Sequence, residues 1–349
     1  MSFMKTFIFS VITLLISSSS WTQQPYYNDV NLSLTGQDLY FELQNKIDQA
    51  SSTFTYGDVR DVLLISDEDT SNSNNVLLVY GYNDSDGNCT TDRSRDKNDF
   101  GGTSCLWNRE HVFARSLANP PMGNVDNSTT GIGADPHNIR SSDQQMNNNK
   151  GDKKFAAGSG TSGNVGGGNW YPGDEWKGDV ARMVMYMYTR YGDRCLPSLS
   201  GVGTLQGGTQ MLQLFLQWNA EDPVTPYEDQ RNNYFETEYG NRNPFIDNPY
   251  LATIIWGGPV AEDRWNIFSI HNFNLNSSIV YPNPADEFLY IQSFSSYNSY
   301  TIYDIFGKKV VANQLPKDAY IPISSLKAGI YIIELSTDTT KSFTKILVE

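Results

Sequence analysis

The pattern of residues changes near Asn272, and this change constrains the fold of the 349-residue chain more than any other feature. From Val280 onward the sequence consists of short alternating segments rich in Ile and Tyr, separated by Pro, Gly and Lys turns. This pattern predicts an all-β sandwich of roughly seventy residues. The preceding part mixes helical and strand patterns. We therefore expect an α+β domain over residues 23–269, a linker over 270–277 and a β-sandwich-like domain over 278–349.

The N-terminal segment has the features of a secretory signal peptide. Lys5 supplies the positive charge, Thr6–Ile16 the apolar run and Ser17–Thr22 a mostly small-residue region for cleavage. We expect residues 1–22 to be this signal. The apolar run is too short to span a bilayer, and no other candidate span is found. The mature protein is expected to be exported and soluble, in the medium or at the cell surface.

The three cysteines fit an oxidising compartment. Cys89 and Cys105 bracket a polar loop, and oxidising surroundings favour a disulfide between them. Cys195 is expected to be a buried free thiol. The chain has no CxxC pair and no paired histidine spacing, which argues against a zinc site.

The net charge of −14 limits how the protein can bind nucleic acid. Nearly all of the excess acid lies in the central domain, which argues against binding through bulk electrostatic attraction. It leaves room for an enzyme that brings a metal ion and a few local cations to one phosphate.

Apolar spacing and capping residues predict the elements of the central domain. The clearest helix is 179–190, whose Met and Tyr stripe is expected to be core rather than a ligand site. Thr225, Pro226 and Glu228 have the pattern of a helix start, and Gly240 that of a helix end. The other predicted elements are a helix over 37–51, a buried strand over 76–82, a strand over 106–113, turns over 125–134, a helix from about Asp143 with a Ser142–Gln145 capping box, a loop over 155–169, a helix over 211–218 and an extended segment over 241–247.

The segment Trp107–Gly151 concentrates the groups suited to chemistry. Two of the three histidines, His111 and His137, lie here among carboxylates, amides and cations. The alternative is a Gly- and Asn-rich surface loop with incidental histidines. The predicted order of strand, long loop and helix can bring His111 and Asn147 together from separate elements.

These residue types suit phosphodiester hydrolysis. A histidine near its ordinary pKa can activate water, and a hard divalent cation on carboxylate and amide oxygens can stabilise the phosphate and the leaving oxygen. Glu110 and Asn147 supply that ligand type. Consecutive strand residues point to opposite faces, so the strand must end or twist near Glu110 and His111 if both act together. The structural alternatives are a surface salt bridge for Glu110 and a helix-end cap for Asn147.

The runs WNREHVFARS and DPHNIRSSDQQMNNNKGD resemble the secreted endonuclease I family of ββα-metal, or His-Me finger, nucleases. The later stretches GDVARMVMYMYTRY and QWNAEDPVTPYEDQRNN agree with the resemblance, which covers roughly residues 39–256. It implies a ββα-metal nuclease core wrapped by helices.

The resemblance also implies site residues. His111 matches the general base, Glu110 and Asn147 the metal ligands, and Asp135, His137 and Asn138 a loop-ordering signature in which Pro136 replaces the usual apolar residue. The phosphate-assisting arginine cannot be aligned, and Arg140 is ranked first among the candidates. The remaining supporting or substrate-binding candidates are Asn108, Arg109, Arg115 and Lys150.

The C-terminal segments YPNPADEFLYI, YDIFGKKV and AGIYIIEL resemble the sorting domain of type IX secretion cargo. This implies a partner in the secretion machinery; an adhesive β-sandwich is the alternative.

The sequence analysis therefore predicts a secreted, monomeric, non-specific endonuclease. It is expected to use Mg²⁺, with Ca²⁺ or Mn²⁺ as alternatives, and to cut DNA, and RNA as well, to 5′-phosphate products. The alternatives are an extracellular phosphodiesterase for small substrates and a non-catalytic surface adhesion protein.

Overall fold

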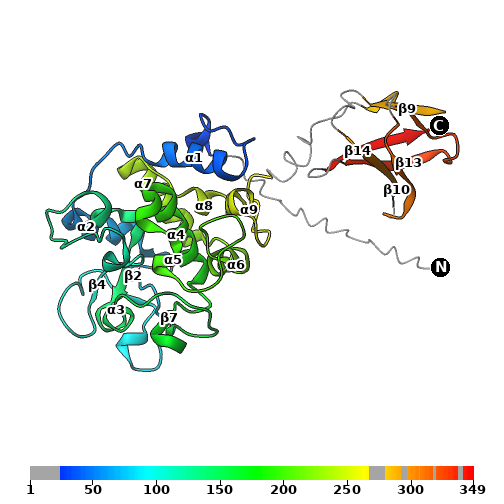
Figure 1. Cartoon of the computed structure of the whole chain (residues 1–349). Helices are drawn as coiled ribbons and strands as arrows, with labels where there is room; N and C mark the ends of the chain where they lie inside the picture. Colours follow the sequence, from blue (N-terminus) through cyan, green and yellow to red (C-terminus); the bar gives the residue numbers. More distant parts are fainter. Residues whose placement is uncertain (1–23, 267–279, 292–296, 306, 317–319, 337–340) are drawn as a thin grey trace, which may run out of the picture. The chain divides into compact units, whose positions relative to one another are not determined.

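The computed structural model describes residues 24–266, 280–291, 297–305, 307–316, 320–336 and 341–349, which form two compact units (Figure 1). One unit lies within residues 1–265 and the other within 266–349. The expected signal peptide and linker lie outside the described residues.

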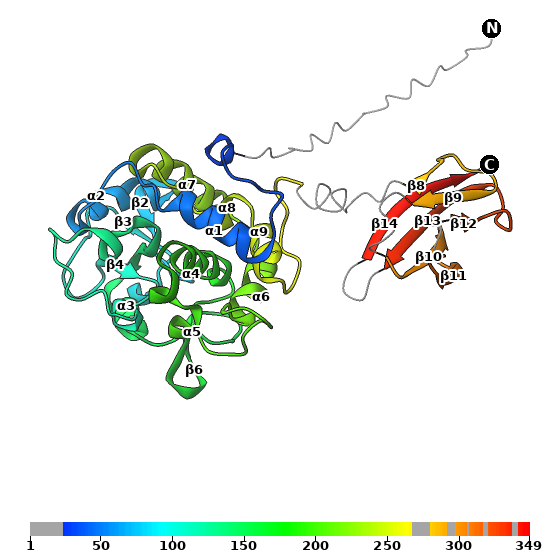
Figure 2. The same ribbon diagram turned by 45° about the horizontal axis from the view of Figure 1, so that its top comes forward.

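Helix α4, Lys177–Tyr191, forms the centre of the first unit. Every residue from 178 to 189 is buried. Helices α1, α5, α6 and α8 pack around it, and Figure 2 shows α4 surrounded by its neighbours. The Met and Tyr stripe is therefore core, as predicted. The stripe alone did not predict that the helix is buried on all sides, including its charged residues Asp179 and Arg182.

The first unit also contains several short elements. Its remaining helices are α1 (Gly36–Ile47), α2 (Tyr56–Ser66), α3 (Gln144–Lys150), α5 (Pro197–Ser200), α6 (Gln213–Glu221), α7 (Pro226–Tyr239), α8 (Pro244–Asp247) and α9 (Tyr250–Trp256). Its strands are β1 (Glu68–Asp69), β2 (Asn72–Leu77), β3 (Ser94–Asp96), β4 (Trp107–His111), β5 (Ile139–Asp143), β6 (Gly163–Val165) and β7 (Asn169–Tyr171).

Strands β4 and β5 pair antiparallel, and α3 follows β5 directly. This two-strand and helix unit was implied by the family resemblance, but residue patterns predicted only a loop before the helix. Strand β5 was missed because all of its residues are buried, polar ones included, so no alternation marks it. Helix α2 covers the pair through a cluster in which Val59 and Leu63 pack with Trp107 and Ile139.

Helix starts and ends follow their capping residues. Helix α7 has the predicted capping box between Thr225 and Glu228, and it ends at Gly240 with φ 73°. Helix α3 begins where expected, but its cap is Asp143, whose carboxylate accepts from the amides of Gln145 and Met146. The predicted cap, Ser142, lies inside β5.

Three predicted segments differ from the structure in extent or type. Strand β2 ends at Leu77, and the rest of the apolar run turns, with Tyr80 at φ 73°. These residues are buried as a turn rather than as a strand. The segment 241–247 is extended only at first, because the side chain of Asn243 caps the short helix α8. The predicted loop 155–169 contains β6 and the start of β7, which form a small hairpin.

The second unit consists of two antiparallel sheets whose inward-facing residues form one apolar core. Their strand orders are β11-β10-β13-β14 and β12-β9-β8. The strands are β8 (Val280–Tyr281), β9 (Phe288–Ile291), β10 (Ser299–Asp304), β11 (Lys309–Gln314), β12 (Tyr320–Pro322), β13 (Gly329–Ser336) and β14 (Lys341–Val348). The mixed α+β unit followed by an all-β unit confirms the predicted fold class.

Candidate active site

A pocket of about 500 Å³ opens where β4 ends and α3 begins its last turn. It is lined by Tyr56, Arg109, Glu110, His111, Ala114, Arg115, Ser116, Pro121, Gly123, Asn124, Asn147, Gly151 and Asp152. Strand β4 ends at His111, so Glu110 and His111 both reach the pocket although they are consecutive. The structure therefore brings together His111, Glu110 and Asn147.

His111 is held in a buried, defined position. Its Nε2 lies 2.8 Å from the carbonyl oxygen of Gly133, and its ring stacks on that of Tyr56, with centroids 5.3 Å apart. A carbonyl oxygen only accepts, so Nε2 must carry a proton, and in the neutral ring Nδ1 is then an acceptor. Burial lowers the pKa of His111 from 6.5 to about 4, against an opposing effect of the Gly133 hydrogen bond. The imidazole is thus neutral at pH 7.

Glu110 is a buried carboxylate with two donors on a single oxygen. Lys150 Nζ lies 3.2 Å from Oε1, and the Tyr80 hydroxyl donates to the same oxygen at 3.3 Å. Burial raises the pKa of Glu110, and the charge and hydrogen bond of Lys150 act in the opposite direction. Oε2 has no hydrogen-bond partner within the described part of the chain and remains available to a ligand.

Asn147 complements this carboxylate from α3. Its Nδ2 donates to the carbonyl oxygen of Arg109 at 3.3 Å. This bond orients the amide, and Oδ1 is left without a partner among the residues that the structure describes. The pocket therefore offers two oxygens of the type that hard divalent cations prefer, with room for water ligands. No cluster of three or more His, Cys, Asp or Glu that could hold a metal occurs in the described ranges.

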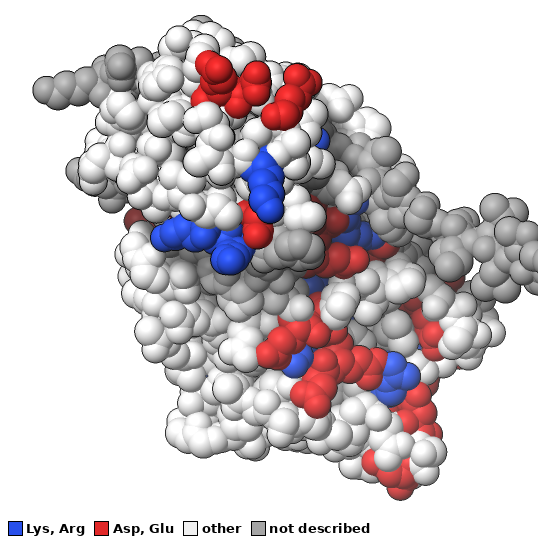
Figure 3. Space-filling view, turned by 90° about the vertical axis from the view of Figure 1, so that its right-hand side faces the viewer, with Lys and Arg blue, Asp and Glu red and all other residues white. Residues whose placement is uncertain are grey.

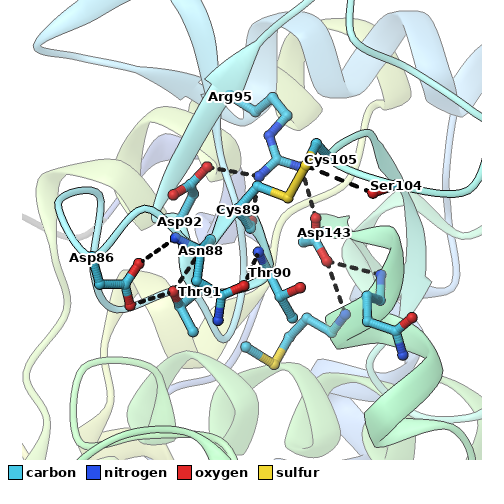
Figure 4. The surroundings of a disulfide bond; sticks show 12 residues. Asp86, Asn88, Cys89, Thr90, Thr91, Asp92, Arg95, Ser104, Cys105 and Asp143 are labelled. Carbon is cyan, nitrogen blue, oxygen red and sulfur yellow. Dashed lines mark hydrogen bonds and ion pairs between the residues drawn. A yellow bond between two sulfur atoms is a disulfide. The ribbon is translucent and has the colours of Figure 1, made fainter.

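Helix α3 is anchored through its cap to the disulfide loop (Figure 4). The Asp143 carboxylate accepts a hydrogen bond from Nη1 of Arg95 at 2.7 Å. Nη2 of the same arginine donates to the carbonyl oxygen of Cys89. Cys89 is bonded to Cys105, as predicted. The disulfide loop thus holds the helix that carries Asn147.

The third cysteine is a buried free thiol, as predicted. Burial raises the pKa of Cys195 to about 12. Its thiol is therefore protonated at neutral pH.

The Asp-Pro-His-Asn signature orders the chain beneath the site. Asp135 is fully buried and binds Arg190 at 2.8 Å and the Tyr191 hydroxyl at 2.7 Å. Asn138 accepts from the amide of Phe113 at 2.8 Å and donates to its carbonyl at 3.1 Å. These bonds fix the chain just after His111.

His137 packs among aromatic rings rather than in the pocket. Its ring centroid lies 4.4 Å from that of Tyr186 and 4.7 Å from that of Phe235. Burial lowers its pKa to about 4. Its position fits loop ordering.

The candidate phosphate-binding residues differ in whether they line the pocket. Arg140 does not line the pocket: its guanidinium lies 2.9 Å from Asp179 and packs on the rings of Trp176 and Tyr227. Although its backbone pairs with Glu110 in the sheet, its side chain belongs to a buried ionic cluster. The structure therefore does not support Arg140, ranked first from sequence, as the phosphate-assisting residue.

Other candidates have clearer places. Arg115 lines the pocket, and its Nη1 donates to the carbonyl oxygen of Gly123 at 3.3 Å. Arg109 also lines the pocket but is packed against Tyr56. Asn108 binds Gln144 at 2.7 Å, joining β4 to α3. Lys150 is buried and forms an ion pair with Glu110.

Acidic side chains form several patches on the face seen in Figure 3, and Lys and Arg form smaller groups among them. This distribution agrees with the net charge of −14. The pocket itself is lined by two basic side chains, Arg109 and Arg115, and two acidic ones, Glu110 and Asp152.

Two stretches of the chain match known families. Residues 35–250 match the family described as Endonuclease I, and residues 279–349 match the secretion system C-terminal sorting domain. An extracellular ribonuclease of Bacillus subtilis (strain 168) is 36% identical over 262 residues, which cover 71% of this chain and 84% of the relative. An extracellular ribonuclease of Bacillus amyloliquefaciens is 35% identical over 263 residues, with 72% and 84% covered. Within the described residues, no helix is long and apolar enough to cross a membrane.

Proposed function

Because the chain belongs to the endonuclease I family and is a secreted nuclease, we propose that it hydrolyses RNA and DNA with His111 as general base and a divalent metal ion on Glu110 and Asn147. The observation that carries the proposal is the state of His111. Its Nε2–H is bound to Gly133, so a neutral Nδ1 can accept a proton in a pocket that also holds an acidic and an amide oxygen. Family membership sets aside the adhesion alternative.

The proposed step is attack of water on phosphorus. Nδ1 of His111 removes a proton from the water as its oxygen attacks, and the bond from phosphorus to the 3′ oxygen breaks. The leaving 3′ oxygen takes a proton from solvent water, and His111 later releases its proton to solvent. The products are therefore a 5′-phosphate and a 3′-hydroxyl. Because the pKa of His111 is about 4, the base is in its active form throughout the neutral range.

Nucleases of this family generally depend on a divalent metal ion. A bound ion supplies Lewis-acid stabilisation of the phosphate and of the leaving oxygen. The free oxygens Oε2 of Glu110 and Oδ1 of Asn147 are the groups that fit it. We assign Mg²⁺ because carboxylate, amide and water oxygens are its preferred ligands, with Mn²⁺ or Ca²⁺ as alternatives.

We assign phosphate binding to Arg115 in place of Arg140. Arg115 lines the pocket, and among the residues that the structure describes its side chain donates a hydrogen bond only to a neutral carbonyl oxygen. Its charge is thus available to a phosphate, whereas that of Arg140 is neutralised by Asp179.

The substrate is tested by incubating the mature protein with RNA, plasmid DNA and a small phosphodiester, each with Mg²⁺ or with a chelator. We expect metal-dependent cleavage of both polymers and 5′-phosphate ends. Cleavage of the small ester alone would favour the phosphodiesterase alternative, and equal cleavage in chelator would contradict the metal assignment.

The assignment of the metal ligands is tested by a binding measurement that does not depend on catalysis, calorimetric titration with Mg²⁺ or Mn²⁺. Glu110→Gln is expected to weaken metal binding at least ~10-fold, because a neutral amide replaces a charged ligand. Asp152→Asn is the matched control, since this carboxylate also lines the pocket. Equal loss in the two variants would contradict the assignment of Glu110.

A further inference from the structure

We propose that Tyr56 is a positioning residue that holds the imidazole of His111 in one orientation and one tautomer. The catalytic part of this inference rests on the proposed function; the structural part does not. Tyr56 is the first residue of α2, far from β4 in the sequence. Its ring lies on that of His111 with an interplanar angle of 19°.

The Tyr56 ring has a second close neighbour. Cζ of Arg109 lies 3.7 Å from the ring centroid. Arg109 and His111 are two residues apart on β4, so alternation places their side chains on the same face of the strand. The Tyr56 ring therefore contacts two side chains of β4, those of Arg109 and His111.

The backbone that carries Tyr56 is itself fixed. The amide of Tyr56 donates to the carbonyl oxygen of Thr129 at 2.8 Å, and the Arg109 guanidinium donates to the Tyr56 carbonyl oxygen. Thr55 and Asp58 close a capping box at the start of α2. A ring held in this way restricts the rotation of the imidazole that packs against it.

Two contacts together leave His111 one arrangement. The stack sets the plane of the imidazole, and the Gly133 carbonyl requires Nε2–H within that plane. A half-turn of the ring would exchange its edges and lose the hydrogen bond. Without Tyr56 only the Gly133 hydrogen bond holds the ring. Rotation of the ring out of its plane then weakens that bond, and the flipped orientation and the Nδ1–H tautomer become accessible.

The ring rather than the hydroxyl of Tyr56 carries this role. The hydroxyl has no hydrogen-bond partner in the described part of the protein, while the ring contacts both His111 and Arg109. Tyr56→Phe should therefore preserve the effect, and Tyr56→Leu should remove it.

The structural test is the ¹⁵N NMR spectrum of the imidazoles in the metal-free full chain at pH 7. The chain has three histidines, so the His111 signals can be assigned by their loss in His111→Asn. We expect an Nε2–H tautomer in the wild type and in Tyr56→Phe, and a mixture of tautomers in Tyr56→Leu. Tyr56→Met gives the same comparison if the leucine variant does not fold.

Phe54→Leu is the matched control. Phe54 stacks on Tyr239 at 5.3 Å and packs against the same apolar cluster as Tyr56, so its loss is a similar structural defect away from His111. We expect its His111 signals to match the wild type. An unchanged tautomer in folded Tyr56→Leu, or the same mixture in Phe54→Leu, would overturn the proposal.

The catalytic test uses the same variants with RNA and Mg²⁺. Tyr56→Leu is expected to lower kcat by roughly 10- to 100-fold with little change in KM, because a misaligned base slows the chemical step. Tyr56→Phe is expected to restore kcat to within about threefold of the wild type. Equal losses in both variants would mean that the hydroxyl acts, which overturns the proposal. Failure of the wild type to cut nucleic acid would contradict the proposed function, while the tautomer measurement still decides the role of Tyr56.

Discussion

Lys150 places its ammonium nitrogen 3.2 Å from Oε1 of Glu110, and both side chains are almost completely excluded from solvent. The same nitrogen donates to the carbonyl oxygen of Val112 at 3.1 Å. Helix α3 therefore supplies two groups to the site: Asn147 as a candidate ligand, and Lys150 as the charge that opposes the effect of burial on Glu110.

Breaking this pair should cost much stability. Lys150→Met leaves Glu110 buried without a counter-charge, and we expect the free energy of unfolding to fall by roughly 3 kcal/mol. Lys177→Met is the control. The Lys177–Glu221 distance is shorter, 2.7 Å, but the Glu221 carboxylate that would lose its partner is 43% exposed, so the loss should cost below about 1 kcal/mol. Urea unfolding measures both. Similar losses would show that burial of Glu110 is not what makes Lys150 important.

Arg115 should contribute directly to phosphate binding. Arg115→Ala is expected to weaken binding of duplex DNA in chelator and to lower the salt dependence, the slope of log K against log salt, by about 0.9. Arg93→Ala is the control, because Arg93 is exposed, paired with Glu175 and outside the pocket. Fluorescence anisotropy across a salt series measures the slopes. An unchanged slope in Arg115→Ala would remove it from the phosphate site.

His137 should make the protein sensitive to acid. Its pKa is about 4 when folded against an ordinary 6.5, so only the unfolded chain binds the proton between these values. The free energy of unfolding should therefore fall as the pH falls from 6.5 to 4, by up to about 1.4 kcal/mol per pH unit for this histidine.

His137→Phe tests this contribution, since phenylalanine keeps the aromatic contacts with Tyr186 and Phe235 but does not titrate. Denaturant unfolding at several pH values should show a shallower acid dependence in the variant. Part of the dependence should remain, because His111 has a similarly lowered pKa. Identical dependence in the two proteins would contradict a buried neutral His137.

The disulfide should stabilise the loop that anchors α3. Cys89 and Cys105 are 16 positions apart, and closing a loop of that size contributes about 3 kcal/mol. Replacing both by serine should lower the unfolding free energy by that amount. Reductant should destabilise the wild type but not the variant, because the remaining thiol, Cys195, is unpaired. If reductant destabilised the double-serine variant as much as the wild type, the effect could not come from the Cys89–Cys105 disulfide.

Local signals predicted local structure well. The capping residues Thr225 and Glu228 fixed the start of α7, and apolar spacing located α4, because neither depends on distant parts of the chain. Strand β5 was missed since its polar residues are buried by tertiary contacts, which no local pattern records.

The sequence predicted some residues of the candidate site and missed others. The grouping of His111, Glu110 and Asn147 followed from residue type and family resemblance, and the pocket confirms their proximity. Arg140, ranked first from the sequence, lies outside the pocket, and residue type alone does not show where a long side chain points. Tyr56 was missed because it reaches the site from another element, and its sequence neighbours carry no chemical signal.

The most direct test of the account is a single-turnover assay of RNA cleavage with Mg²⁺, comparing the wild type with His111→Ala. We expect the variant to keep its fold and its Mg²⁺ affinity while its cleavage rate falls by roughly 10²- to 10⁴-fold, the usual contribution of a general base. A folded variant that cleaves at nearly the wild-type rate would contradict the assignment of His111 as the base.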